Sequence, residues 1–117
     1  MNIRKYPQNI TTLSLSEYNM QFQFSVNPDL FWFEGHFDDF PILAGVAQID
    51  WVMMLVKQYF PNSGHFSGIQ QVKYQQPIFP KEVITLTIEL NSEKSILTFE
   101  YENDRETKSS GKIKLQI

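Results

Sequence analysis

The chain is organised around one stretch, Gly35-His36-Phe37-Asp38-Asp39-Phe40-Pro41-Ile42-Leu43-Ala44-Gly45-Val46-Ala47-Gln48-Ile49-Asp50-Trp51. In this stretch a histidine precedes an apolar segment, and a carboxylate lies inside that segment. The segment runs from Ala44 or Gly45 to about Phe60 with almost no polar stripe, which predicts a helix that protein surrounds on nearly every side. Because burying a carboxylate without a partner is costly, Asp50 indicates a function. We interpret the stretch as an active site.

Length and composition predict a single globular domain over residues 1–117. The hydrophobic share of 42% and the aromatic share of 15% supply a substantial core and argue against disorder. The net charge of −3 provides no extended basic field, so neither nucleic acid nor an anionic membrane is expected as a partner.

The residue types that are scarce restrict the chemistry and the location. The chain has no cysteine and only two histidines, which excludes a thiolate nucleophile and a cysteine-ligated zinc, so we expect no metal and no cofactor. Residues 1–16 contain no apolar signal core, and the longest apolar run, Val52 to Val56, is far shorter than the ~20 residues of a membrane span. The sequence therefore predicts a cytoplasmic protein.

Alternating apolar and polar residues predict strands before and after the helix. The period of two is clear in 20–26 and 82–90, and further strands are predicted at 66–78, 96–101 and 112–117, with a loop at 102–111. The short connections favour an antiparallel meander. The predicted fold class is α+β, with an antiparallel sheet of five to six strands wrapped around one long central helix. Because a curled sheet covers a helix incompletely, we expect a homodimer to complete the burial.

The run from Phe33 to Asp50 resembles the active-site segment of the 3-hydroxyacyl-[acyl carrier protein] dehydratases of the FabA/FabZ type. That pattern has Gly-His-Phe, a proline five positions after the histidine, Gly-Val at nine and ten, and an acidic residue at fourteen; the matching residues are His36, Pro41, Gly45, Val46 and Asp50. The segment 72–80 resembles the strand that follows the helix in this family. Residues 46–51 most resemble the ApeI-like thioester dehydratases of aryl polyene pathways.

This resemblance implies a hot-dog fold and an enzyme without a cofactor. The implied reaction is dehydration of 3-hydroxyacyl thioesters to trans-2-enoyl thioesters in fatty acid or aryl polyene biosynthesis, with an acyl carrier protein as the partner that delivers the substrate. The implied assembly is a homodimer in which His36 of one subunit works with Asp50 of the other. Where the family often has proline or basic residues, this chain has Asp38, Ala44, Gln75 and Gln76.

Dehydration needs a base, a group that holds the enolate charge, and an acid. An imidazole titrates near neutral pH, so His36 is suited to act as the base. Gly45 is the first residue of the predicted helix, where a backbone N–H can polarise the thioester carbonyl. Asp50 would protonate the departing hydroxyl. The structural alternatives are a packed histidine bonded to backbone, a glycine that only starts a helix, and a core aspartate bonded to backbone or to Gln48. His65 is expected to be a surface histidine.

Apolar side chains near the motif suggest where an acyl chain would lie. The candidate tunnel residues are Phe33, Phe37, Phe40, Trp51 and Met54, although an ordinary interface core explains the aromatic residues equally well. Two other functions remain open on the sequence alone. One is a hot-dog thioesterase in which a carboxylate activates water, and the other is a non-catalytic hot-dog module that binds acyl chains.

Overall fold

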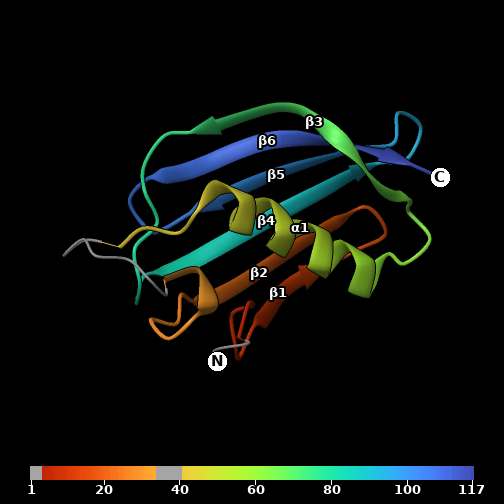
Figure 1. Cartoon of the computed structure of the whole chain (residues 1–117). Helices are drawn as coiled ribbons and strands as arrows, with labels where there is room; N and C mark the ends of the chain where they lie inside the picture. The colour runs from red at the N-terminus through yellow and green to blue at the C-terminus, as the bar shows by residue number, and fades with distance from the viewer. Residues whose placement is uncertain (1–3, 34–40) are drawn as a thin grey trace.

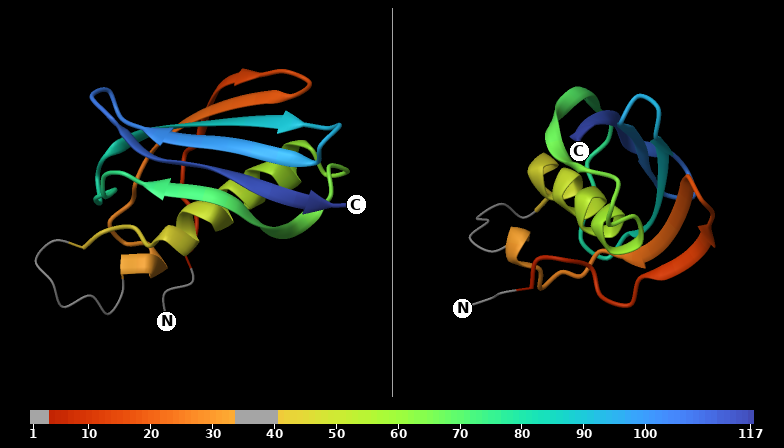
Figure 2. Two further views of the ribbon diagram at one scale, coloured as in Figure 1. Left: turned by 90° about the horizontal axis from the view of Figure 1, so that it is seen from above. Right: turned by 90° about the vertical axis from the view of Figure 1, so that its right-hand side faces the viewer.

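A long helix lies in the hollow of a curled antiparallel sheet (Figure 1). The computed structural model describes residues 4–33 and 41–117, and this part of the chain contains one α-helix, one short 3-10 helix and six strands. In the right-hand view of Figure 2 the sheet curves around one side of the helix. The predicted fold class, an antiparallel sheet of up to six strands around one central helix, is confirmed.

The helix α1 (Gly45–Tyr59) begins and ends within one residue of its predicted limits. Ala44 precedes it in an extended conformation, and the backbone N–H of Phe60 closes it on the Val56 carbonyl at 2.7 Å. Its buried residues are Ala47, Gln48, Ile49, Trp51, Val52, Leu55 and Val56. Val46 is 66% exposed and Lys57 is exposed as well, so the described part of one chain does not surround the helix on every side.

The six strands form one sheet in the order β1-β2-β4-β5-β6-β3, and every neighbouring pair is antiparallel. The elements are β1 (Thr11–Leu15), β2 (Asn19–Ser25), the 3-10 helix η1 (Phe31–Phe33), β3 (His65–Tyr74), β4 (Val83–Asn91), β5 (Ile96–Glu102) and β6 (Thr107–Gln116). The strand that follows the helix thus forms one edge of the sheet, and β1 forms the other.

Three details differ from the sequence-based prediction. The strand β1 was not predicted, because its residues are exposed on both faces and carry no alternation. The loop predicted at 102–111 was too long, since β6 already begins at Thr107. The strands after the helix are not a simple meander: β3 pairs with β6 and not with β4, which follows it in sequence. Pairing of this kind depends on distant contacts, which local patterns do not reveal.

The core lies between α1 and the concave face of the sheet. The predicted inward face of β2 is confirmed, because Met20, Phe22 and Phe24 are buried while the alternate residues are not. Phe24 meets the indole of Trp51 edge-on, with ring centroids 5.6 Å apart. Each fully buried apolar side chain of this size contributes about 1.5–3 kcal/mol, so the helix is held mainly by this contact surface.

Candidate active site

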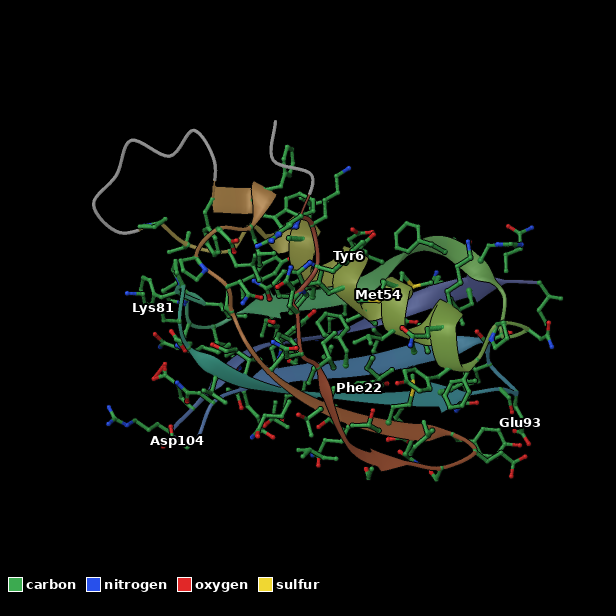
Figure 3. The ribbon with its side chains drawn as sticks, turned by 90° about the horizontal axis from the view of Figure 1, so that it is seen from below. Tyr6, Phe22, Met54, Lys81, Glu93 and Asp104 are labelled. Carbon is green, nitrogen blue, oxygen red and sulfur yellow. The ribbon has the colours of Figure 1, made fainter. Side chains whose placement is uncertain are left out.

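Asp50 lies on the part of α1 that the sheet does not cover. It is partly exposed and lines a surface pocket of about 480 Å³ together with Tyr6, Met53, Met54, Lys57 and Gln58. Figure 3 shows Tyr6 and Met54 next to each other beside the helix. A carboxyl group therefore faces a hollow whose walls combine methionine side chains with polar groups, where a small apolar substituent and a reacting hydroxyl could both be accommodated.

The N-terminal segment places Tyr6 against Asp50. The hydroxyl of Tyr6 lies near the Asp50 carboxylate, and both side chains line the same pocket. Burial first, and then the charge and hydrogen bond of Asp50, raise the pKa of Tyr6 above its ordinary value of 10.0. Tyr6 therefore keeps its proton at neutral pH, so its hydroxyl can serve as a hydrogen-bond donor toward Asp50.

Gly45 borders a second pocket at the start of α1. This pocket of about 390 Å³ is lined by Ile42, Leu43, Ala44, Gly45, Gln48, Tyr74, Gln75, Gln76 and Pro77. The first N–H groups of a helix have no partner within it, and the alanine at position 44 has no side-chain acceptor that could cap them. The start of α1 can therefore receive an electronegative oxygen, such as a thioester carbonyl.

A buried polar network fixes the start of α1 to the sheet. The Gln48 side chain accepts a hydrogen bond from Ser109 Oγ at 2.5 Å and donates to the Leu43 carbonyl at 3.4 Å, while Tyr101 Oη donates to the Gln48 carbonyl at 2.5 Å. Burial first, and then the charges of Tyr74 and Asp50, raise the pKa of Tyr101 well above its usual range. This network holds the helix start and the Asp50 turn at defined positions on β5 and β6.

The two pockets do not share a lining residue. Gly45 and Asp50 are five positions apart on α1, which separates their directions by about 140° around the helix axis. Within one chain the structure thus places the candidate acid and the candidate carbonyl-binding group on different sides of the same helix. Within the described part of one chain, these two groups therefore line separate pockets.

The other predicted site residues have different surroundings. His36, Phe37 and Phe40 lie outside the described residues, so their assigned roles stay predictions. Phe33 is buried in η1, and Trp51 is fully buried in the core. The Trp51 Nε1–H donates to the Lys5 carbonyl at 2.7 Å. Of the three candidate tunnel residues that the structure describes, Met54 lines the Asp50 pocket. Contact of any of the five candidates with an acyl chain stays a prediction.

The second histidine of the chain, His65, lines neither the Asp50 pocket nor the Gly45 pocket. His65 begins β3 and is exposed, as expected for a surface histidine.

Among the described residues no group of three histidine, cysteine, aspartate or glutamate side chains could hold a metal ion. Within residues 4–33 and 41–117, no helix combines the length and the apolar character that a membrane crossing needs.

Comparison with known proteins identifies the family. The family model described as ApeI-like, ApeI dehydratase, matches residues 12–112. The chain belongs to the ApeI-like family. A solved relative, from the dehydratase heterocomplex ApeI:P of Xenorhabdus doucetiae, is 40% identical with a TM-score of 0.87, and the match covers 95% of this chain and 98% of that one. The resemblance predicted from the motif around His36 is thereby confirmed at the level of the family.

More distant relatives of this ApeI-like chain match over a shorter length or share only its fold. A 3-hydroxyacyl-[acyl-carrier-protein] dehydratase FabZ from Clostridium botulinum (strain Loch Maree / Type A3) is 32% identical over 79 residues, which are 62% of this chain and 55% of that protein. The match thus spans about half the length of this curated relative. Thioesterase superfamily member 2 from Mus musculus, at 12% identity and a TM-score of 0.66 over 91% of this chain and 80% of that one, shares the hot-dog fold alone.

Sequence reasoning missed the groups that surround Asp50 in this ApeI-like chain. Tyr6 is far from the motif in sequence, and no pattern near it indicates that it folds back onto α1. One signal was available: a buried indole N–H normally has an acceptor, so Trp51, next to Asp50, indicated that another segment approaches the helix there. The identity of that segment required the structure.

Proposed function

We propose that this chain is a 3-hydroxyacyl-[acyl carrier protein] dehydratase that produces trans-2-enoyl thioesters in fatty acid or aryl polyene biosynthesis. The observation that carries the proposal is the Asp50 carboxyl group, which faces a partly apolar pocket from a helix whose first N–H groups are uncapped by a side chain of Ala44. Membership of the ApeI-like family and the dehydratase names of its relatives support the same reaction.

The proposed chemistry balances as the loss of one water molecule. His36 removes the proton from the carbon next to the thioester carbonyl, and the Gly45 N–H stabilises the negative charge that develops on the carbonyl oxygen. Asp50 gives its proton to the 3-hydroxyl group, which leaves as water as the carbon–carbon double bond forms. The proton held by His36 then returns to Asp50, through solvent, before the next substrate binds.

We further propose that two chains form each site. Gly45 and Asp50 line separate pockets of one chain, which favours a site whose acid and carbonyl-binding group come from different chains. This supports the arrangement in which His36 and Gly45 of one subunit act with Asp50 of its partner. It also gives a function to the exposed face of α1.

The edge strand β3 supports a second copy as that partner. It lies at the end of the sheet and carries three large exposed apolar side chains, Phe66, Ile69 and Tyr74, each between 47% and 52% exposed. An apolar sheet edge that stays uncovered is prone to pair with other chains. The solved relative is a heterocomplex, so a different hot-dog chain is the alternative partner that the experiment must distinguish.

The test offers purified protein a 3-hydroxyacyl chain on an acyl carrier protein and identifies the product by mass spectrometry. The proposal predicts a trans-2-enoyl carrier, with turnover lowered by about 10²–10⁴ in Asp50→Asn and in His36→Ala. His65→Ala is the matched control, because this exposed histidine should leave turnover unchanged.

Other products would contradict the proposal. Free thiol from both 3-hydroxyacyl and saturated substrates, without enoyl product, would indicate the thioesterase. Binding of acyl chains without turnover across several chain lengths would indicate the non-catalytic module. Turnover that begins only after a second hot-dog protein is added would keep the reaction and replace the homodimer by a heterocomplex.

A further inference from the structure

The segment that precedes β1 is anchored to the helix and to η1 at one atom. The carbonyl oxygen of Lys5 accepts hydrogen bonds from two indoles, Trp32 Nε1 and Trp51 Nε1, each at 2.7 Å. One residue earlier, the Arg4 carbonyl accepts the Phe31 N–H at 2.6 Å. Backbone atoms fixed by both η1 and α1 have little freedom to move, so this segment is part of the folded body of the domain.

Tyr6 is held between this anchor and a second one. On its other side Pro7 is buried, and the Gln8 N–H donates to Asn27 Oδ1 at 3.0 Å. The segment therefore fixes Tyr6 on both sides and brings it to the pocket that it lines together with Asp50, Met53 and Met54. The remaining 38% exposure of Tyr6 leaves its hydroxyl at the wall of the pocket and not inside the core.

We propose that Tyr6 is a positioning residue of the dehydration site, whose hydroxyl orients the Asp50 carboxyl group and donates a hydrogen bond to the carboxylate that remains after Asp50 has protonated the leaving hydroxyl. This inference rests on the proposed function, because it assigns to Tyr6 a part in that reaction. Tyr6 keeps its own proton throughout. Asp50 alone gives up its proton to the leaving group and regains it.

The physical reason is the change of charge on Asp50 during the reaction. When Asp50 donates its proton it becomes an anion in a partly apolar pocket, where an uncompensated charge is unfavourable. A hydrogen bond from a neutral hydroxyl to a carboxylate is stronger than one between neutral groups, so Tyr6 stabilises the later state more than the earlier one. An interaction that strengthens along the reaction coordinate raises kcat.

Other ionisable groups also face Asp50. Lys57 lies about two turns further along α1 and lines the same pocket. The charges of Tyr74 on β3 and of Asp50 both raise the pKa of Tyr101 on β5. The ammonium group of Lys57 and the side-chain amide of Gln58, which lines the same pocket, could also accompany the carboxylate. A test must therefore separate the effect of the Tyr6 hydroxyl from the general electrostatics of the pocket.

The test compares Tyr6→Phe with Tyr18→Phe in the dehydration assay. Tyr18 is the matched control, since it is also a partly exposed tyrosine, at 43%, but lies in the turn between β1 and β2. We expect Tyr6→Phe to lower kcat by about 10- to 100-fold with KM changed less than about twofold, and Tyr18→Phe to change neither. In an Asp50→Asn background, Tyr6→Phe should cause no further loss, because Tyr6 acts through Asp50.

A second readout does not depend on activity. The tyrosine ring carbons are followed by NMR through a pH titration of wild type and of Asp50→Asn. Removing the Asp50 charge should move the Tyr6 titration down toward its ordinary pKa of 10.0.

These outcomes distinguish the inference from the proposed function. An unchanged kcat in Tyr6→Phe, a loss confined to KM, or an equal loss in the Asp50→Asn background would overturn the role of Tyr6 while the dehydratase stands. Wild-type protein without enoyl product would overturn the function itself. In that case the titration still decides whether Tyr6 and Asp50 interact, and an unchanged Tyr6 titration in Asp50→Asn would refute the pairing.

Discussion

The hydroxyl of Tyr74 lies directly over Gly45: a Cβ placed on Gly45 would stand 2.5 Å from Tyr74 Oη and 2.6 Å from its Cζ. Tyr74 ends β3, and Gly45 begins α1, so this contact joins the edge strand to the helix start. Both residues line the pocket in which we place the thioester carbonyl. The absence of a side chain at position 45 therefore allows the close packing of Tyr74 against the start of α1.

Gly45→Ala should leave the fold intact and impair catalysis. The atoms that a methyl group would meet belong to the end of a half-exposed tyrosine, which can swing away. In the proposed site the methyl group would crowd the thioester carbonyl at the start of α1, so we expect turnover to fall by about 10²-fold or more. The double variant Gly45→Ala/Tyr74→Ser checks the cause. If it recovers the activity of Tyr74→Ser alone, the clash with tyrosine explains the loss and the carbonyl assignment is wrong.

Gln48→Leu tests the buried network under the helix start. Leucine would fill similar space but leave the Ser109 hydroxyl without its acceptor, at a cost of roughly 1–3 kcal/mol in the free energy of unfolding. The combined variant Gln48→Leu/Ser109→Ala should cost less than the sum of the two single variants, because both polar partners are then absent. Denaturant unfolding at one protein concentration measures this coupling, and strictly additive losses would argue that the two side chains do not interact.

Two glycines in the sheet give a matched pair for stability. A Cβ on Gly111 would lie 2.5 Å from the Gln71 carbonyl oxygen and 2.8 Å from the Phe99 ring, whereas one on Gly68 would meet nothing within 4 Å. Gly111→Ala should therefore lower the free energy of unfolding by about 1–3 kcal/mol or more, because backbone must move. Gly68→Ala should change it by less than about 0.5 kcal/mol. Equal effects in thermal or denaturant unfolding would contradict the packing of β6 against β3 and β5.

Tyr101 should make the fold sensitive to alkaline pH. Its pKa is raised well above 10.0, chiefly by burial, so the unfolded chain releases this proton at a lower pH than the folded one. The contribution of Tyr101 to stability is complete below about pH 10 and is lost as the pH rises toward its folded pKa. The stability difference between wild type and Tyr101→Phe should therefore shrink as unfolding is measured at increasing alkaline pH. A difference that stays constant would show that Tyr101 is not buried.

The elements that bury an apolar face could be predicted from the sequence. Alternation in β2 and β4, and the apolar run of α1, follow directly from which side of each element meets the core. The strand β1 could not be predicted in this way, since its five residues are all exposed. The first part of β6 also escaped prediction, because it buries the polar Lys108 and Ser109, whose partners Glu82 and Gln48 are distant in sequence.

Part of the candidate site could likewise be predicted from the sequence, and part of it required the structure. Asp50 and Gly45 could be selected from the sequence because their residue types are unusual for their positions and match a family pattern. Tyr6 could not, because its contact with Asp50 depends on the fold of the segment that precedes β1. The separate pockets of Gly45 and Asp50 also required the structure, and they support our proposal that two chains complete the site.

The most direct test of the account mixes two inactive variants. His36→Ala and Asp50→Asn are purified separately, combined in equal amounts, and allowed to exchange subunits before enoyl-carrier formation is measured. If His36 of one chain acts with Asp50 of its partner, each mixed dimer regains one intact site, and the mixture should recover about one quarter of wild-type turnover. A mixture that exchanges subunits, as verified by mass spectrometry, yet stays inactive would contradict the shared site.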